Sequence, residues 1–119
     1  MLITINNGKH NQGEKEMIVS TLESVPGREI KKVIGLVRGN TVRAKNFARD
    51  IGSWFKSLAG GEIKSYTEML TEAREESLNR MCAAADAMGA NAVIGVRFTT
   101  SGIMGGAAEV LTYGTAVVV

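Results

Sequence analysis

The sequence has little of what metal sites and disulfide frameworks require. It contains one cysteine, Cys82, and one histidine, His10. A single cysteine cannot form a disulfide within the chain, which predicts a reducing, cytoplasmic location. Zinc and copper sites need several histidine, cysteine or carboxylate ligands that converge on one point. We therefore expect no dedicated soft-metal site within one subunit, although ligands repeated around an oligomer axis could supply the missing number.

Long apolar runs and aromatic residues are also scarce. No apolar run approaches the ~20 residues that cross a bilayer, and residues 1–16 lack the apolar core and cleavage site of a secretory signal. Aromatic residues make up 5% of the chain. Phe47, Trp54 and Phe55 recur at helical spacing and are expected to face the core, so bases would find no stacking platform. Neither a membrane nor a nucleic acid is predicted as a partner.

The chain is long enough for one domain. It has 119 residues, of which 45% are hydrophobic and 22% charged, as in ordinary soluble proteins. Residues 1–16 are mostly polar and are predicted to form a flexible N-terminal extension. Residues 17–119 are predicted to form a single α+β domain.

Hydrophobic periodicity predicts the element order β-β-α-α-β-β. Alternating or continuous apolar runs predict strands, and apolar steps of three and four residues predict helices. The strands are expected at about 17–22, 30–41, 91–99 and 107–119, and the helices at about 44–59 and 65–88. Pro26-Gly27 is a turn signal, which predicts a hairpin of the first two strands. Gly60, Gly61 and Gly89 are expected to end the helices. We therefore expect an antiparallel-dominated, curved sheet packed on two helices.

The strands carry more apolar surface than two helices can cover. In 108–119 neither alternating face is clearly polar over its last half, and the chain ends on three valines. An uncovered apolar strand invites pairing with another chain, and soluble monomers rarely expose large apolar patches. The sequence therefore predicts assembly into a closed ring of subunits.

Charge is divided unevenly along the chain. Residues 1–64 carry a net +5 and residues 65–119 a net −3, within an overall +2. A basic half can follow a phosphate backbone, or it can pair with the acidic half of a neighbouring subunit. We favour subunit pairing because the basic residues are not interleaved with exposed aromatic residues. The acidic positions Glu68, Glu72, Glu75 and Asp86 are interpreted as a solvated helix face.

Arg74 is predicted to lie inside the apolar arc of the second helix. An arginine there usually needs a carboxylate partner, and Asp50 and Glu109 are the candidates because both flank apolar stretches. The alternative is a side chain that snorkels to the edge of the arc. Cys82 has no histidine with which to form a defined dyad, and a packed thiol is inert. No catalytic residue and no cofactor is predicted.

Several stretches together resemble the YbjQ family of small bacterial proteins. They are Ile34–Arg43, Gly60–Glu68 continuing through Ala73–Glu76, Gly89–Arg97 and Tyr113–Val117. The resemblance covers about 17–119. It implies an α+β subunit that assembles into a homopentamer, with the sheets contributing to a central barrel-like structure. The family is labelled heavy-metal-binding and is otherwise of unknown function.

The first functional hypothesis is a cytoplasmic, homo-oligomeric binding or scaffold protein without intrinsic catalysis. The second is a heavy-metal-binding protein whose ligands gather at subunit interfaces. The third is an enzyme with an intersubunit carboxylate–arginine site. The partner expected in each case is another copy of the chain, with a small ligand or a metal ion possible. The residues expected to line an interface or pocket are Arg43, Asp50, Tyr66, Arg74 and Glu109.

Overall fold

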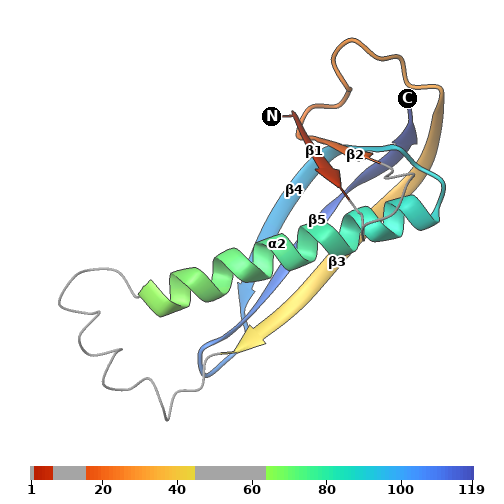
Figure 1. Ribbon diagram of the computed structural model, residues 1–119. Helices are drawn as coiled ribbons and strands as arrows, with labels where there is room; N and C mark the ends of the chain where they lie inside the picture. The colour runs from red at the N-terminus through yellow and green to blue at the C-terminus, as the bar shows by residue number, and fades with distance from the viewer. Residues whose placement is uncertain (1, 7–15, 45–63) are drawn as a thin grey trace.

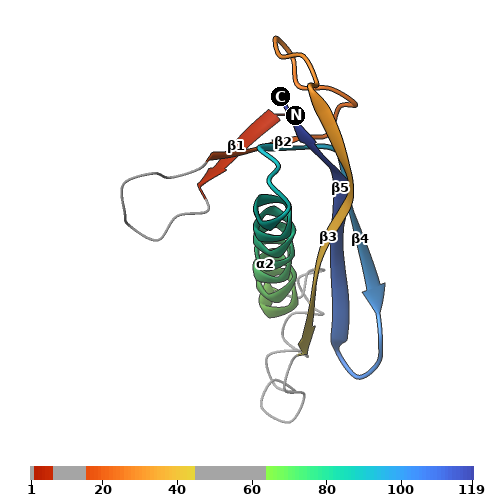
Figure 2. The same cartoon turned by 90° about the vertical axis from the view of Figure 1, so that its right-hand side faces the viewer.

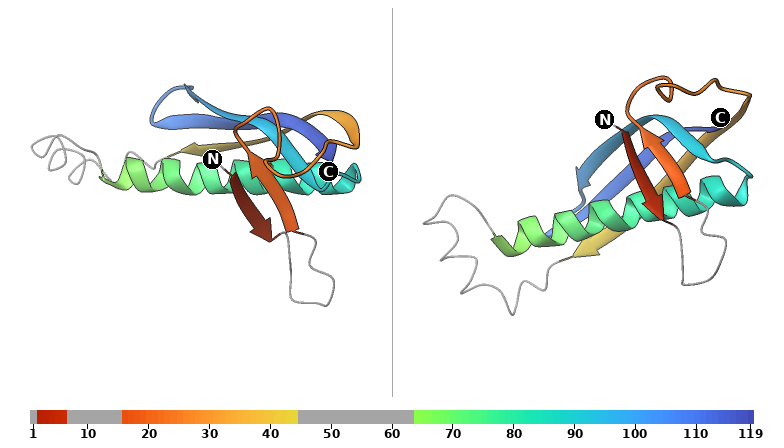
Figure 3. Two further views of the ribbon diagram at one scale, coloured as in Figure 1. Left: turned by 90° about the horizontal axis from the view of Figure 1, so that it is seen from above. Right: turned by 45° about the horizontal axis from the view of Figure 1, so that its top comes forward.

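A curved sheet and one long helix form two layers (Figures 1 and 3). The computed structural model describes residues 2–6, 16–44 and 64–119. The strands are β1 (Leu2–Asn6), β2 (Glu16–Ser20), β3 (Lys32–Ala44), β4 (Ala92–Gly102) and β5 (Ala107–Val118), and the helix is α2 (Lys64–Ala87). The predicted α+β class is confirmed, and each of these elements from β2 onward overlaps its predicted range.

The sheet has the strand order β1-β2-β4-β5-β3. β1 and β2, β4 and β5, and β3 and β5 pair antiparallel, whereas β2 and β4 pair in parallel over two residues. The longest ladder joins β3 to β5, from the pair Lys32 and Val118 to the pair Ala44 and Ala107. The prediction of an antiparallel-dominated sheet is thus confirmed, and β3 is an edge strand of it.

The predicted hairpin of the first two strands is wrong. β2 pairs with β1 and β4, while β3 lies at the other end of the strand order. Pro26-Gly27 does make a turn, since Val25 and Arg28 form an isolated bridge around it. The connection does not return β3 alongside β2, because its apolar residues Val25 and Ile30 pack against the sheet instead. Leu2–Asn6, predicted as part of a flexible extension, forms β1.

The described residues contain one helix, whereas two were predicted. The predicted helix at about 44–59 lies outside the described residues except for Ala44, which is the last residue of β3. Gly60 and Gly61 lie outside them as well. Gly89 ends α2 as predicted: it has a φ of 85°, and the N–H of Ala90 donates to the carbonyl of Ala85 at 3.1 Å. This is the Schellman pattern, in which a glycine adopts the left-handed conformation.

The core is divided between the two faces of the sheet. The larger cluster lies between α2 and the sheet and includes Val37, Met81, Cys82 and Val93. A smaller cluster lies on the opposite face, where Val25 covers part of β4 and β5. Figure 2 shows that α2 lies on one side of β3, β4 and β5 and that the connection between β2 and β3 reaches only one end of the other side. Over the rest of that side, no described element covers the sheet.

Candidate functional site

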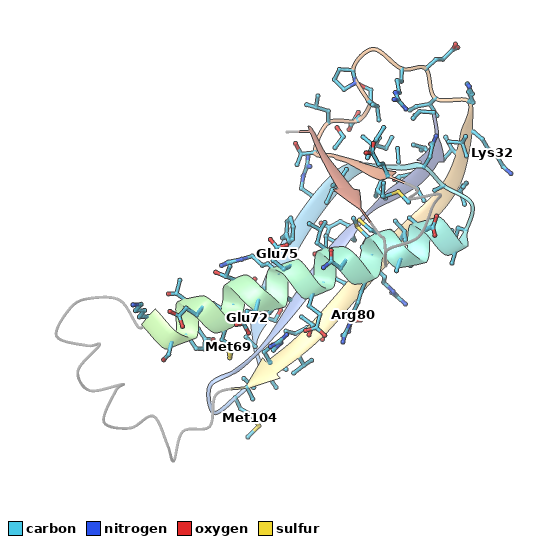
Figure 4. The ribbon with its side chains drawn as sticks, viewed as in Figure 1. Lys32, Met69, Glu72, Glu75, Arg80 and Met104 are labelled. Carbon is cyan, nitrogen blue, oxygen red and sulfur yellow. The ribbon has the colours of Figure 1, made fainter. Side chains whose placement is uncertain are left out.

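An ion-pair cluster joins the end of β3 to α2. Arg43 donates from Nε and Nη2 to Oε2 of Glu76 at 3.1 and 2.6 Å, and from Nη1 to Oε2 of Glu72 at 3.2 Å. Arg80 pairs with the other oxygen of Glu76 and donates to the backbone carbonyl of Asn40 at 2.6 Å. Figure 4 shows Glu72 and Arg80 on α2, with Arg80 on the side of the helix toward β3. Arg43, which the sequence predicted to be a site residue, therefore has carboxylate partners.

The cluster holds its groups in their charged forms. The hydrogen bond to Glu76 raises the pKa of Arg43, and the bond from Arg43 lowers the pKa of Glu76. The charge of Arg80 and a hydrogen bond with Thr41 also lower the pKa of Glu76. A carboxylate engaged by two guanidinium groups is a poor proton acceptor. The arrangement is therefore suited to fastening α2 to β3 rather than to acid–base chemistry.

The other predicted site residues do not join this cluster. Tyr66 on α2 and Glu109 on β5 are half-buried, and Asp50 lies outside the described residues. Arg43 pairs with Ala108 across the sheet, and Glu109 is the next residue of β5, so Arg43 and Glu109 lie on opposite faces. Among the described residues, the structure does not gather these predicted residues into one pocket lining.

Arg74 differs from its prediction. Its side chain is exposed, and it forms no ion pair with a carboxylate of the described residues. The helical wheel does place it on the inward arc. However, α2 crosses the sheet obliquely and packs mainly on β3 and β5, so the described strands do not cover that arc along its whole length (Figure 1). Pairing with Glu109, one of the two candidates, is therefore wrong, and the other candidate, Asp50, lies outside the described residues.

The described residues do not fit a heavy-metal site within one subunit. No group of three or more histidine, cysteine, aspartate or glutamate side chains there could hold a metal ion. Cys82, the one thiol, is buried in the core beside Met81. Burial raises the pKa of Cys82 to about 11, whereas a soft metal binds the thiolate. The sulfur atoms of Met81 and Cys82 therefore belong to the packing of α2 on the sheet.

The side of β3, β4 and β5 that α2 does not cover, which we call the open face, carries a second candidate site. Residues paired across neighbouring strands share a face. Tyr113 of β5 pairs with Arg38 of β3 and with Arg97 of β4, so the three side chains form one row. Val37 and Gly39 face α2, which places Arg38 and its row on the open face.

This row of residues was not predicted from the sequence. Alternation within each strand indicates which residues share a face, but it does not reveal which strands are neighbours. The spacing of Glu76 and Arg80 is different, because residues four apart on a helix are adjacent. The ion pair of Glu76 and Arg80 could therefore have been predicted from the sequence, whereas their contact with Arg43 could not.

Comparison with known proteins places the chain among small proteins of uncharacterised role. A UPF0145 protein of Archaeoglobus fulgidus is 58% identical over 104 residues, covering 87% of this chain and 96% of that protein. A UPF0145 protein of Thermotoga maritima is 58% identical over 101 residues, covering 85% of this chain and 95% of that protein. None of the helices that the structure describes is long and apolar enough to span a membrane.

A solved structure shares the fold. It is the crystal structure of a protein of unknown function of the DUF74 family from Pediococcus pentosaceus, with a TM-score of 0.56 at 16% sequence identity. The match covers 87% of this chain and 97% of the other. The family YbjQ, described as "Putative heavy-metal-binding", matches residues 17–119. Together with the close UPF0145 relatives, this match shows that the chain belongs to the YbjQ family.

Proposed function

We propose that this protein is a cytoplasmic, homo-oligomeric binding or scaffold protein without intrinsic catalysis, and that its assembly is a pentameric ring. The observation that carries the proposal is the apolar surface of the open face. Leu36 is 69% exposed, Val42 55% and Tyr113 38%. Such a surface is typical of a contact with another chain, because soluble monomers rarely leave apolar side chains exposed together.

The edge of the sheet supports the same proposal. β3 is 13 residues long, and the described strands pair with it on one side only, through β5. Within the described chain, one backbone carbonyl of β3, that of Asn40, accepts a hydrogen bond from the side chain of Arg80. A long edge strand beside an apolar face favours association with a second copy. The number five is the assembly implied by the resemblance to the YbjQ family.

Light scattering coupled to size-exclusion chromatography tests the proposal on the full chain at micromolar concentration. The expected mass is five times the chain mass of 12.7 kDa. Leu36→Asp should shift the protein to smaller species while circular dichroism shows retained folding, because Leu36 is exposed in the subunit. Met104→Asp is the matched control: Met104 is 79% exposed, beyond the end of the β4 strand. A wild-type monomer, or unchanged assembly of Leu36→Asp, would contradict the proposal.

Native mass spectrometry with added zinc, copper or cadmium tests the heavy-metal hypothesis separately. The proposed scaffold role expects no stoichiometric metal uptake by the assembly. Stoichiometric uptake that disappears when the assembly is dissociated would instead establish metal ligands at subunit interfaces.

A further inference from the structure

We propose that the row Arg38, Tyr113 and Arg97 on the open face of one copy binds Glu68 and Glu75 on helix α2 of the next copy. This inference rests on the proposed assembly and names the two surfaces that meet in it. These four charged side chains form no ion pair within the described subunit, and the spacing of the two arginines is similar to that of the two glutamates.

The two arginines have no carboxylate partner among the described residues. The ion pairs there involve Arg43 and Arg80 instead. Nη1 of Arg97 donates to the backbone carbonyls of Thr21 and Val96, each at 2.8 Å. These bonds hold the guanidinium in place without neutralising it. Glu109, the carboxylate of β5 on the same face, lies four residues from Tyr113 along the strand, or roughly 13 Å. The row therefore places two positive charges, of which that of Arg97 is held by backbone carbonyls, on either side of the aromatic ring of Tyr113.

Helix α2 offers two matching carboxylates. Glu68 and Glu75 are exposed, and neither forms an ion pair within the part of the chain that the structure describes. Glu72 and Glu76 differ, since both are bound by Arg43. Figure 4 shows Glu75 on α2. The carboxylates without an ion pair in the first half of α2 are therefore Glu68 and Glu75.

The spacing of the two pairs is similar. Glu68 and Glu75 are seven residues apart, which is two helical turns and about 10.5 Å along the axis. Arg38 and Arg97 lie on β3 and β4 with β5 between them, so they are two strand spacings apart, or about 9.6 Å. A helix crossing the strands can thus place one glutamate near each arginine, with the ring of Tyr113 between them. Close pairs of this kind set the register of an interface.

The geometry also indicates how such contacts propagate. The open face and the outward side of α2 lie on opposite sides of the subunit (Figure 2). The contact therefore joins two different surfaces, which makes it heterologous and leaves both copies with one surface unused. Repetition continues until the ring closes. The contact also agrees with the uneven charge of the chain. Arg38 belongs to the basic residues 1–64, whereas Glu68 and Glu75 belong to the acidic residues 65–119.

Charge reversal with rescue tests the inference by light scattering and sedimentation. Arg38→Glu/Arg97→Glu and Glu68→Lys/Glu75→Lys should each raise the dissociation constant of the assembly by about tenfold or more, since close interfacial charge pairs couple strongly. The chain that carries all four substitutions should recover assembly, because each reversed charge again meets its opposite. Arg28→Glu/Glu29→Lys reverses two exposed charges in the connection between β2 and β3, outside the proposed contact, and should leave assembly unchanged. Higher salt should weaken the wild-type assembly.

The outcomes separate this inference from the proposed function. If the wild type assembles and both reversed pairs assemble as well as it does, the scaffold proposal stands and the assigned contact is wrong. If the wild type is a monomer, the assembly itself is contradicted. Fluorescence anisotropy with a labelled oligouridine is the further arm. Binding that is lost in Arg38→Glu/Arg97→Glu would identify the row as a nucleic-acid surface and overturn the contact with α2.

Discussion

Gly39 of β3 lies against the backbone of α2 at Met81. A Cβ atom at Gly39 would be 2.3 Å from the backbone nitrogen of Met81 and 2.3 Å from the backbone oxygen of Ser77. The strand and the helix are therefore in contact through main-chain atoms at this point. This close approach also brings Glu76 and Arg80 beside the end of β3, where they bind Arg43.

Gly39→Ala should therefore destabilise the fold strongly. The added methyl group would meet backbone atoms, which cannot move aside as a flexible side chain can. We expect a loss of at least about 3 kcal/mol, the upper part of the range for overpacked cores. Urea denaturation at fixed protein concentration measures it. Gly102→Ala is the matched control, because a Cβ at Gly102 of β4 meets nothing within 4 Å. Equal stability of the two variants would contradict the close contact.

A buried hydrogen bond gives a second prediction. The hydroxyls of Ser77 on α2 and Thr112 on β5 are 2.6 Å apart, and both residues are fully buried. The Ser77 hydroxyl also donates to the carbonyl of Arg74 at 3.0 Å. Ser77→Ala would leave the Thr112 hydroxyl buried without its partner, at a cost of ~1–3 kcal/mol. Thr112→Val should cost less, because Ser77 keeps its bond to Arg74.

A double-mutant cycle checks this pair. Ser77→Ala/Thr112→Val removes both hydroxyls, so no buried polar group is left unpaired. The double variant should be more stable than the sum of the single losses predicts, as measured by urea denaturation. Strict additivity of the two losses would show that the hydroxyls do not interact.

The sequence predicted the elements better than their arrangement. Apolar periodicity located α2 and the strands from β2 to β5 within a few residues, because it depends on local burial. Pairing depends on contacts between distant residues. Pro26-Gly27 illustrates the difference: it predicted a hairpin, yet the neighbouring Val25 packs on the sheet beside Val117. β3 consequently pairs with β5 rather than with β2.

The candidate site was predicted less well. Arg43 was singled out, but its partners Glu72 and Glu76 were interpreted as a solvated face or passed over. Arg74 shows why: a helical wheel assumes that a helix is covered along its whole inward side, whereas described strands cover only part of α2. The row of Arg38, Tyr113 and Arg97 exists only through strand pairing, so no spacing within the sequence could have predicted it.

The thiol of Cys82 should be unreactive in the folded protein. Burial raises its pKa to about 11, so the reactive thiolate is rare at pH 8. A thiol reagent should modify Cys82 slowly in buffer and rapidly in urea. Ala83→Cys, at the exposed neighbouring position, should add one fast-reacting thiol.

Because the pKa of Cys82 is higher in the folded state than in the unfolded chain, the stabilisation that comes from the neutral thiol is complete below about pH 8.5. It should be lost as the pH rises toward about 11. Rapid modification of Cys82 in buffer would contradict its burial.

The ion-pair cluster of Arg43, Glu76 and Arg80 should make the free energy of unfolding depend on pH in the acidic range. The hydrogen bond from Arg43 lowers the pKa of Glu76 in the folded state, whereas the pKa of a glutamate in the unfolded chain is about 4.3. The folded state therefore binds the proton less readily. The stabilisation from ionised Glu76 is complete above the unfolded value and disappears as the pH falls through the lower, folded value.

Glu76→Gln removes this dependence, because an amide does not titrate. Urea denaturation over a pH series, at fixed protein concentration because assembly contributes to stability, should show the wild type more stable at pH 7. The difference in stability between wild type and Glu76→Gln should shrink progressively below about pH 4.3. In that range Glu76 binds a proton in the unfolded chain more readily than in the folded protein, so unfolding of the wild type is favoured. Glu29→Gln is the control, since Glu29 is exposed, forms no ion pair within the described part of the chain and has no place in the proposed contact. A difference between wild type and Glu76→Gln that stays constant from pH 7 to acid would show that Glu76 acts through packing rather than through its charge.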